Sequence, residues 1–220
     1  MNILITGSSR GIGLALVTQA LAKGNSVLAV ARDVSKLEVL QRDYPKTLTL
    51  VEANVSEPAG IKTVASAVAK VGSLDTLINN AGVYKKDVKV EDFAESFHVN
   101  ATTPFLVTEA LLPYLAKSKA PKVAQISTLM GSIHDNGSGG SYAYRSSKSA
   151  LNMITRSLSV DHPNVTFVLL HPGWVKTEMG GSNAPTEIAD SAKGIWQVIE
   201  TAKSSDSGSF KDFQGRNLSW

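Results

Sequence analysis

Six short apolar runs recur along this 220-residue chain and constrain its fold more than any other feature. They are nearly all apolar instead of alternating with polar residues, as is typical of strands buried on both faces of a sheet. Stretches with helical spacing fill most of the intervals between them. Because strands and helices alternate, we expect an α/β fold, with a parallel sheet of about seven strands flanked by helices.

The expected elements follow from this pattern. Strands are predicted at residues 3–5, 27–31, 48–53, 74–79, 123–127 and 165–170. Helices are predicted at residues 12–23, 34–42, 59–71, 101–116 and 142–159. No internal repeat or low-complexity linker divides the chain, so we expect a single domain over residues 1–220.

Composition excludes several kinds of function. The chain has no cysteine, which rules out disulfides, thiolate metal sites and a cysteine nucleophile. Its four histidines are scattered without metal-ligand spacing, so no metal is expected. A net charge of +3 without a dense basic run argues against nucleic acid as a partner. No leader sequence and no apolar stretch of about 18 residues is seen, so we expect a cytoplasmic protein without a membrane span.

A glycine-rich turn, TGSSRGIG at residues 6–13, joins the first predicted strand to the first predicted helix. Glycines there allow a tight turn and let backbone amides approach a pyrophosphate, while the helix N-terminus attracts the negative charge. This context predicts a doubly wound Rossmann domain that binds a dinucleotide. The residues assigned to the phosphate site are Gly7, Ser9, Arg10, Gly11, Ile12 and Gly13.

The end of the second strand indicates which dinucleotide is bound. NAD sites place an acid there for the ribose hydroxyls, whereas an arginine accepts the 2′-phosphate of NADP. This chain has the neutral Ala31 followed by Arg32, and Arg10 offers a second guanidinium. Asp33 is the rival carboxylate, but it comes one or two residues late. The sequence therefore favours NADP(H) as the cofactor.

Tyr144 and Lys148 open the helix predicted at residues 142–159. They are four residues apart, so they share one face a single turn apart. A nearby ammonium favours the phenolate, so Lys148 is expected to lower the pKa of Tyr144 and make it a general acid and base. Taken alone, this spacing is weak evidence.

Further polar segments follow other strands at the same expected edge of the sheet, where α/β folds bind ligands. They are Asn79 to Gly82, Asn100 just inside the next helical region, Ser127 with Thr128, and His171 to Gly173. Taken in order, the segments TGxxxGIG, NNAG, N, [ST], YxxxK and PGxVxT resemble the short-chain dehydrogenase/reductase family from residue 2 to about 178. The C-terminal tail resembles the carbonyl-reductase-like branch of the family, also called sniffer-like or C-factor-like.

The resemblance implies a reductase that moves a hydride between nicotinamide and a small carbonyl or alcohol substrate. Tyr144 would exchange the proton with the substrate oxygen. Lys148 would lower the tyrosine pKa and bind the nicotinamide ribose, and Asn100 would hold a water that relays protons to it. The resemblance also assigns cofactor contacts on the adenosine ribose and nicotinamide sides to Asn80, Ala81, Gly82, Pro172, Gly173, Val175 and Thr177.

Two positions depart from the family pattern. The catalytic hydroxyl is usually a serine three residues before a glycine, and counting back from Gly131 gives Thr128. Ser127 is the alternative, with Ser132 a distant third. The adenine-binding Asp-Val pair appears as Asn54-Val55, which keeps an acceptor for the adenine amino group but has no charge.

Other readings stay open. A non-catalytic NADP(H)-binding regulatory or signalling protein would keep this fold, although it would not need Tyr144. A nucleotide-sugar epimerase is disfavoured because it needs a longer C-terminal region. Residues 178–187 are expected to form a short substrate lid. Long apolar faces on the helices at 101–116 and 142–159 favour a homodimer or homotetramer, as in the family.

Overall fold

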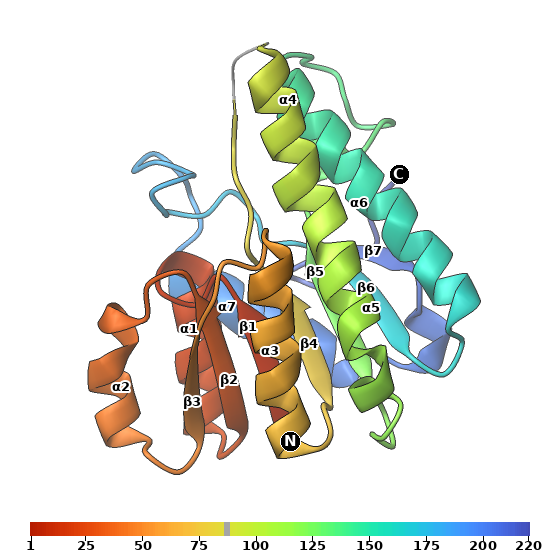
Figure 1. The fold of residues 1–220 in the computed structure, drawn as a ribbon. Helices are drawn as coiled ribbons and strands as arrows, with labels where there is room; N and C mark the ends of the chain where they lie inside the picture. The colour runs from red at the N-terminus through yellow and green to blue at the C-terminus, as the bar shows by residue number, and fades with distance from the viewer. Residues whose placement is uncertain (86–88) are drawn as a thin grey trace.

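In the computed structural model, which describes residues 1–85 and 89–220, seven strands form one parallel sheet (Figure 1). Its strand order is β3-β2-β1-β4-β5-β6-β7. The strands are β1 (Asn2–Thr6), β2 (Ser26–Ala31), β3 (Leu48–Glu52), β4 (Thr76–Asn79), β5 (Lys122–Ile126), β6 (Thr166–His171) and β7 (Ser209–Asp212). The prediction of a doubly wound α/β fold is confirmed, and β7 is the strand that the apolar runs did not locate.

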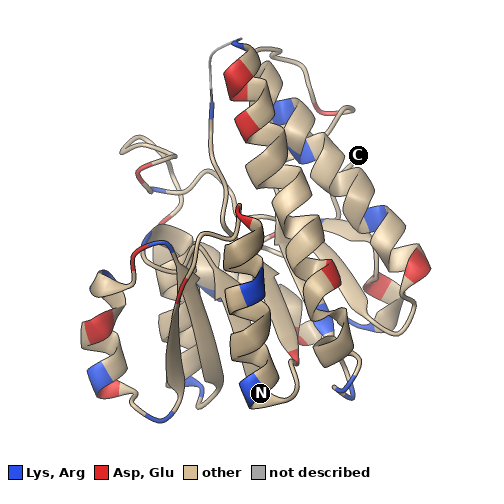
Figure 2. Ribbon diagram, in the orientation of Figure 1, with Lys and Arg blue, Asp and Glu red and all other residues tan. Residues whose placement is uncertain are grey.

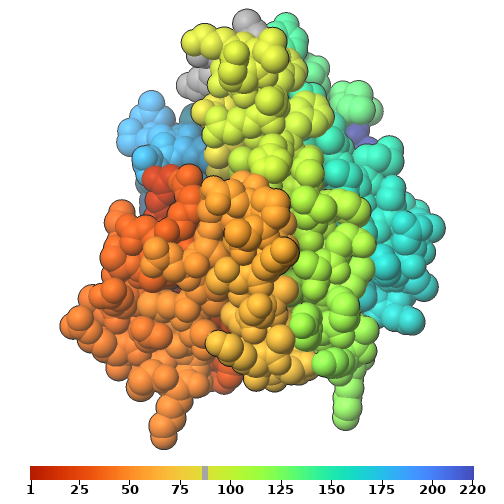
Figure 3. All heavy atoms as spheres, in the orientation of Figure 1, coloured from red at the N-terminus to blue at the C-terminus, as the bar shows by residue number. Residues whose placement is uncertain are grey.

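Helices cover both faces of the sheet. They are α1 (Gly11–Ala22), α2 (Glu38–Asp43), α3 (Pro58–Val71), α4 (Val90–Phe97), α5 (Thr103–Leu115), α6 (Tyr142–Asp161) and α7 (Ile188–Thr201). In Figure 1, α3, α5 and α6 lie in front of the sheet, and α1 and α7 lie behind it. The side chains of α3, α4 and α5 hide much of the sheet from this side (Figure 3).

Two helical predictions were incomplete. The helix expected at residues 101–116 begins earlier, because α4 runs through a π-helical turn, His98–Thr102, into α5. Val90, Phe93 and Phe97 repeat along α4 at helical spacing, but only Ser96 is buried in this helix, so its apolar face is only partly covered. The helix expected at 34–42 is divided into a 3₁₀ turn, Ser35–Leu37, and the short α2.

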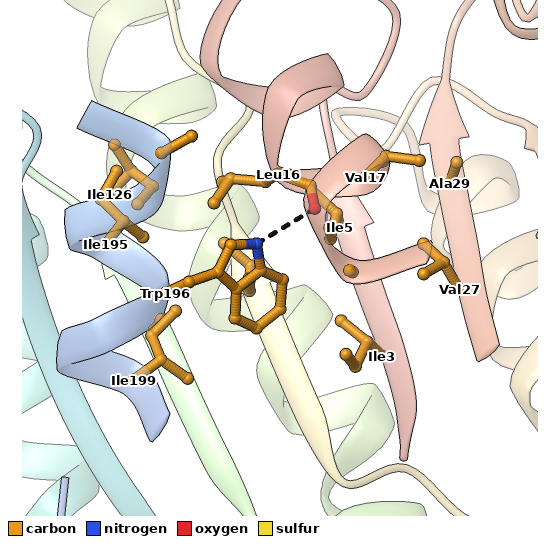
Figure 4. Packing of buried hydrophobic residues seen from close by; sticks show 14 of the residues in the cluster. Ile3, Ile5, Leu16, Val17, Val27, Ala29, Ile126, Ile195, Trp196 and Ile199 are labelled. Atoms are coloured by element: carbon orange, nitrogen blue, oxygen red, sulfur yellow. Dashed lines mark hydrogen bonds between the residues drawn. The ribbon is translucent and has the colours of Figure 1, made fainter. Parts of the chain in front are cut away.

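The core has a layer on each face of the sheet. Ile3 and Ile5 of β1 face α1 and α7, whereas Leu4 between them faces α3 and α5. Trp196 of α7 is 2% exposed, and its indole N–H donates to the carbonyl of Leu16 in α1 at 3.1 Å (Figure 4). This indole fills the space between the two helices and the sheet, and its polar atom is satisfied despite its burial.

Charged side chains lie on helices and loops, and the strands carry very few in this view (Figure 2). Over residues 1–85 and 89–220, no helix is long and apolar enough to cross a membrane. Over the same ranges, no group of three or more His, Cys, Asp and Glu side chains could hold a metal ion.

Candidate active site

The carboxyl ends of β1 and β4 form the centre of the site, because the strand order reverses between them. The Thr6 hydroxyl oxygen accepts hydrogen bonds from the backbone N–H groups of Asn80 and Ala81, at 3.0 and 3.1 Å. The Asn80 side chain donates to the carbonyls of Thr6 and Gly7. These bonds join the NNAG segment to the glycine-rich turn, so two predicted site segments lie side by side.

The glycine-rich turn is shaped by close backbone contacts. Gly7 has a φ of 67°, in the left-handed region that favours glycine. A Cβ atom on Gly13 would lie 2.2 Å from the carbonyl oxygen of Gly7, so only glycine lets α1 approach the turn this closely. In the described chain, the first turn of α1 has no acidic residue, and its N-cap Arg10 makes no side-chain capping bond. The helix end is therefore open to an anion.

Both arginines assigned to the cofactor lie on the surface near this turn. Arg32 is exposed at the end of β2, and within the described ranges it has no ion pair. The side chain of Ser35, together with its backbone N–H, which donates to Asp33 at 2.9 Å, holds the pKa of this rival carboxyl below its usual value. The Arg10 guanidinium forms an ion pair with Glu178, a contact that the sequence did not indicate.

Asn54 and Val55 lie after β3, as expected. The Asn54 side chain is engaged locally, because its oxygen accepts from the N–H of Ser56 and its amide donates to Glu57. Val55 is 7% exposed and packs in the core layer under α3. A ligand amino group would have to share the Asn54 oxygen with Ser56.

The PGxVxT segment, residues 172–177, returns to the glycine-rich turn. A Cβ on Gly11 would lie 3.5 Å from the Thr177 methyl group, so the two segments are adjacent. Val175 is buried and bridges to Thr186, which closes residues 176–185 into a loop. Trp174 donates from its indole N–H to the carbonyl of Gly180 at 2.7 Å. The expected lid is thus tied at several points, and Trp174 is 57% exposed at its base.

Tyr144 lies in the first turn of α6 and is 9% exposed. Its phenol lies beside the side chain of Thr128, which lowers the pKa of the phenol. Ser127 instead points inward and donates to the Asn152 side chain at 2.6 Å, and the Ser132 hydroxyl oxygen accepts from the N–H of Asp135. Of the three hydroxyls considered, Thr128 is the one beside the tyrosine.

The expected direction of the Tyr144 pKa shift is wrong. Burial, with a smaller contribution from the neighbouring Tyr84, raises the pKa of Tyr144 to about 12. The Thr128 side chain lowers this pKa and offsets the rise only in part. Lys148 is itself buried, which lowers the pKa of its amino group to about 8. Desolvation exceeds the effect of the ammonium, because removing water penalises the phenolate more than a lysine one turn away favours it.

Lys148 and Asn100 flank the same backbone segment. The Lys148 amino group donates to the carbonyl of Ile126 at 2.8 Å. A Cβ on Gly82 would lie 3.2 Å from the Asn100 side-chain oxygen and 3.7 Å from the Lys148 nitrogen. Asn100 lies in the π-helical turn, a local irregularity that often marks functional sites. Its side chain bonds both backbone groups of Val83 and the hydroxyl of Ser147.

The loop between Thr128 and α6 is long, and most of its residues are exposed. Arg145 holds it in place, donating to the carbonyls of Gly139 and Met130 and to the hydroxyl of Ser138. The sequence did not reveal this anchor, nor Tyr84, whose ring packs on Tyr144. An aromatic residue directly after the NNAGV segment was the available signal for Tyr84.

Comparison with known proteins agrees with this arrangement. The sequence model described as short chain dehydrogenase matches residues 1–188. The protein named C-signal from Myxococcus xanthus is 46% identical over 156 residues, covering 68% of this chain and 94% of its own.

Two solved structures superpose along the whole chain. The NADPH-bound carbonyl reductase from chicken fatty liver has a TM-score of 0.93 at 34% identity, covering 100% of this chain and 98% of its own. The carbonyl reductase Sniffer of D. melanogaster has a TM-score of 0.94 at 32% identity, covering 100% and 99%. The resemblance drawn from the sequence motifs is therefore confirmed, and this chain belongs to the short-chain dehydrogenase/reductase family of oxidoreductases.

Proposed function

We propose that this protein is an NADPH-dependent carbonyl reductase that converts a small aldehyde or ketone to an alcohol. The observation that carries the proposal is the buried phenol of Tyr144, which lies beside the Thr128 side chain at the ligand-binding edge of the sheet. With a pKa of about 12, this phenol keeps its proton at neutral pH. A protonated group in this place is suited to act as an acid, which is the role that carbonyl reduction requires.

The residues at the phosphate end fit a dinucleotide with a 2′-phosphate. A side chain at Gly13 would close the backbone cradle, and the start of α1 offers N–H groups without a competing acid. Arg32 supplies a planar set of donors suited to phosphate, with Arg10 as the second clamp. The chicken and Pseudomonas aeruginosa carbonyl reductases that resemble this chain were solved with NADPH and NADP, respectively.

Bound NADPH would supply the hydride that forms the new C–H bond at the carbonyl carbon. Tyr144 gives its proton to the carbonyl oxygen as the C=O π bond breaks, so the products are an alcohol and NADP⁺. Thr128 orients the carbonyl oxygen through its hydroxyl. Lys148 has donors beyond its bond to Ile126, and these would hold the nicotinamide ribose. Together with a water held by Asn100, Lys148 returns a proton to Tyr144.

The 46%-identical relative named C-signal supports a second candidate, a regulatory protein that binds the cofactor without turnover. A pure binder gains nothing from a buried tyrosine beside a threonine hydroxyl, so the reductase remains the preferred function. The two candidates differ in one measurable property, which is the consumption of NADPH when a carbonyl compound is present.

The test combines cofactor binding with turnover. NADPH and NADH are titrated by fluorescence, and NADPH oxidation is then followed with a panel of aldehydes, ketones and diketones, with Tyr144→Phe as the blank. We expect tighter binding of NADPH and turnover that Tyr144→Phe abolishes. NADPH binding by both proteins without turnover on any panel member would favour the regulatory candidate, and tighter NADH binding would overturn the assignment of Arg32.

A further inference from the structure

Tyr84 lies on the segment that leaves β4, directly beyond the NNAGV residues. Its ring stands nearly perpendicular to the ring of Tyr144, with 4.7 Å between the ring centroids and 81° between the planes. Aromatic rings prefer this edge-to-face arrangement because the positive edge of one ring meets the negative face of the other. The Tyr144 ring is therefore in direct contact with an aromatic ring from another part of the chain.

The hydroxyl of Tyr84 makes a second contact, with the Ser141 hydroxyl at 3.0 Å. Ser141 is the N-cap of α6, and its backbone is left-handed, with φ 45° and ψ 43°. Over residues 1–85 and 89–220 it is the only residue other than glycine with a positive φ. This conformation is unfavourable for an L-residue, so it needs support from its surroundings. Tyr84 supports it three residues before Tyr144.

Asn100, in the π-helical turn, fixes the backbone next to Tyr84. The Asn100 side chain accepts from the N–H of Val83 and donates to its carbonyl, both at 2.9 Å. Asn100 also donates to the hydroxyl of Ser147 on α6. The segment that carries Tyr84 is thus held to the π-helical turn and, through that turn, to the helix that carries Tyr144.

We propose that Tyr84 is a positioning residue for the carbonyl reduction, holding the Tyr144 phenol toward Thr128 through its ring and setting the start of α6 through its hydroxyl. This inference rests on the proposed function of Tyr144. Among the titratable groups of residues 1–85 and 89–220, Tyr84 from the β4 segment faces this phenol, and Lys148 lies one turn along α6. Removing the Tyr84 ring admits water to the phenol, and the pKa of Tyr144 then falls toward its ordinary value, because burial and Tyr84 both raise it.

The test compares Tyr84→Leu, which removes the ring, with Tyr84→Phe, which keeps the ring and loses the hydroxyl. Tyr142→Leu is the matched control: it removes a tyrosine from the same end of α6, and this side chain is 61% exposed. Two properties are measured in each variant. They are kcat and KM with NADPH and an active carbonyl substrate, and the ionisation of Tyr144 by ultraviolet difference titration against a Tyr144→Phe version of the same variant.

We expect Tyr84→Leu to lower kcat roughly tenfold to a hundredfold, as small misplacements of a catalytic group do, with little change in KM for NADPH. Its Tyr144 titration midpoint shifts to lower pH. Tyr84→Phe recovers most of kcat, and Tyr142→Leu behaves as the wild type. Wild-type kcat and an unmoved midpoint in Tyr84→Leu, or equal damage in Tyr84→Phe and Tyr84→Leu, would overturn the proposal.

The titration separates this proposal from the proposed function. If the wild-type protein reduces no carbonyl compound, the reductase assignment fails, yet the Tyr144 midpoint still reports whether Tyr84 holds the phenol. A midpoint that moves in Tyr84→Leu and stays in Tyr142→Leu supports the positioning contact by itself. A midpoint that moves equally in both variants contradicts it.

Discussion

The glycine-rich turn and Tyr144, the acid of the proposed function, lie at the same edge of the sheet but are built differently. The turn is held by backbone contacts that exclude a side chain, because a Cβ on Gly13 would lie 2.2 Å from the carbonyl oxygen of Gly7. The tyrosine is held by side chains from distant segments, namely Tyr84 and Thr128. A binding site for an invariant phosphate can be set by the backbone alone, whereas a reacting group has to be placed and tuned by its neighbours.

The largest effect that distinguishes the two regions is expected from Gly13→Ala. The added Cβ meets the Gly7 carbonyl, so the turn and α1 must move apart, with a loss of about 3 kcal/mol in folding stability. NADPH affinity falls by about a hundredfold, since that corresponds to a similar free energy. Thermal unfolding and fluorescence titration measure both quantities.

Gly137→Ala is the matched control in the loop between Thr128 and α6, because nothing lies within 4 Å of its added Cβ. It should leave stability and affinity within the error of the wild type. Equal damage from the two substitutions would show that the loop is as constrained as the turn, and the contrast between the regions would fail.

Thr128→Val tests whether neighbouring side chains control the activity of Tyr144. It removes the hydroxyl beside Tyr144, and we expect kcat to fall about a hundredfold, as for other positioned donors. Thr128→Ser keeps the hydroxyl, and its kcat should stay within a few-fold of the wild type.

Ser127→Ala loses the bond to Asn152 and should lower stability while sparing kcat. A catalytic defect confined to Ser127→Ala would mean that the serine is the reacting hydroxyl.

Arg32→Ala sharpens the assignment of the cofactor. Loss of its charge-assisted bonds to a 2′-phosphate should weaken NADPH binding roughly tenfold, or about 1.4 kcal/mol, and leave NADH binding unchanged. Glu178→Gln should strengthen NADPH binding slightly, because it frees Arg10 from its ion pair. Equal losses for both cofactors in Arg32→Ala would place the 2′-phosphate elsewhere.

The smallest effect concerns His171, whose buried Nδ1 atom has no hydrogen-bond partner over residues 1–85 and 89–220. Burial lowers the pKa of His171 from 6.5 to about 4, despite the opposing effect of Asp212. The unfolded chain therefore binds a proton at higher pH than the folded one does, and stability falls as pH drops from 6.5 toward 4. His171→Asn should remove this loss of stability between pH 6.5 and 4, measured by urea unfolding. An unchanged slope would mean that His171 titrates normally.

The sequence predicted the parts of the molecule that depend on local pattern. Apolar strands, the glycine-rich turn and the Tyr144–Lys148 spacing each produce a signal within a few residues. Contacts between distant segments produce none. Nothing near Tyr84 shows that it packs on Tyr144, and nothing near Arg10 shows its pairing with Glu178.

The pKa of Tyr144 was mispredicted for the same reason. Spacing along α6 indicates that Lys148 is near, but the extent of burial depends on the loops that cover the site. Helix α4 was missed although Val90, Phe93 and Phe97 follow helical spacing, because it is only 8 residues long and packs on α6 instead of the sheet. The burial of Tyr144 and the packing of α4 both depend on contacts between distant segments of the chain.

The central step of the proposed function is hydride transfer coupled to proton donation by Tyr144. The most direct measurement uses NADPH carrying deuterium at the transferred C4 position, together with an aldehyde or diketone that the wild-type protein reduces. We predict one deuterium at the carbinol carbon of the alcohol, formed by the wild type and not by Tyr144→Phe. An alcohol without deuterium, or equal product from Tyr144→Phe, would contradict the assigned chemistry.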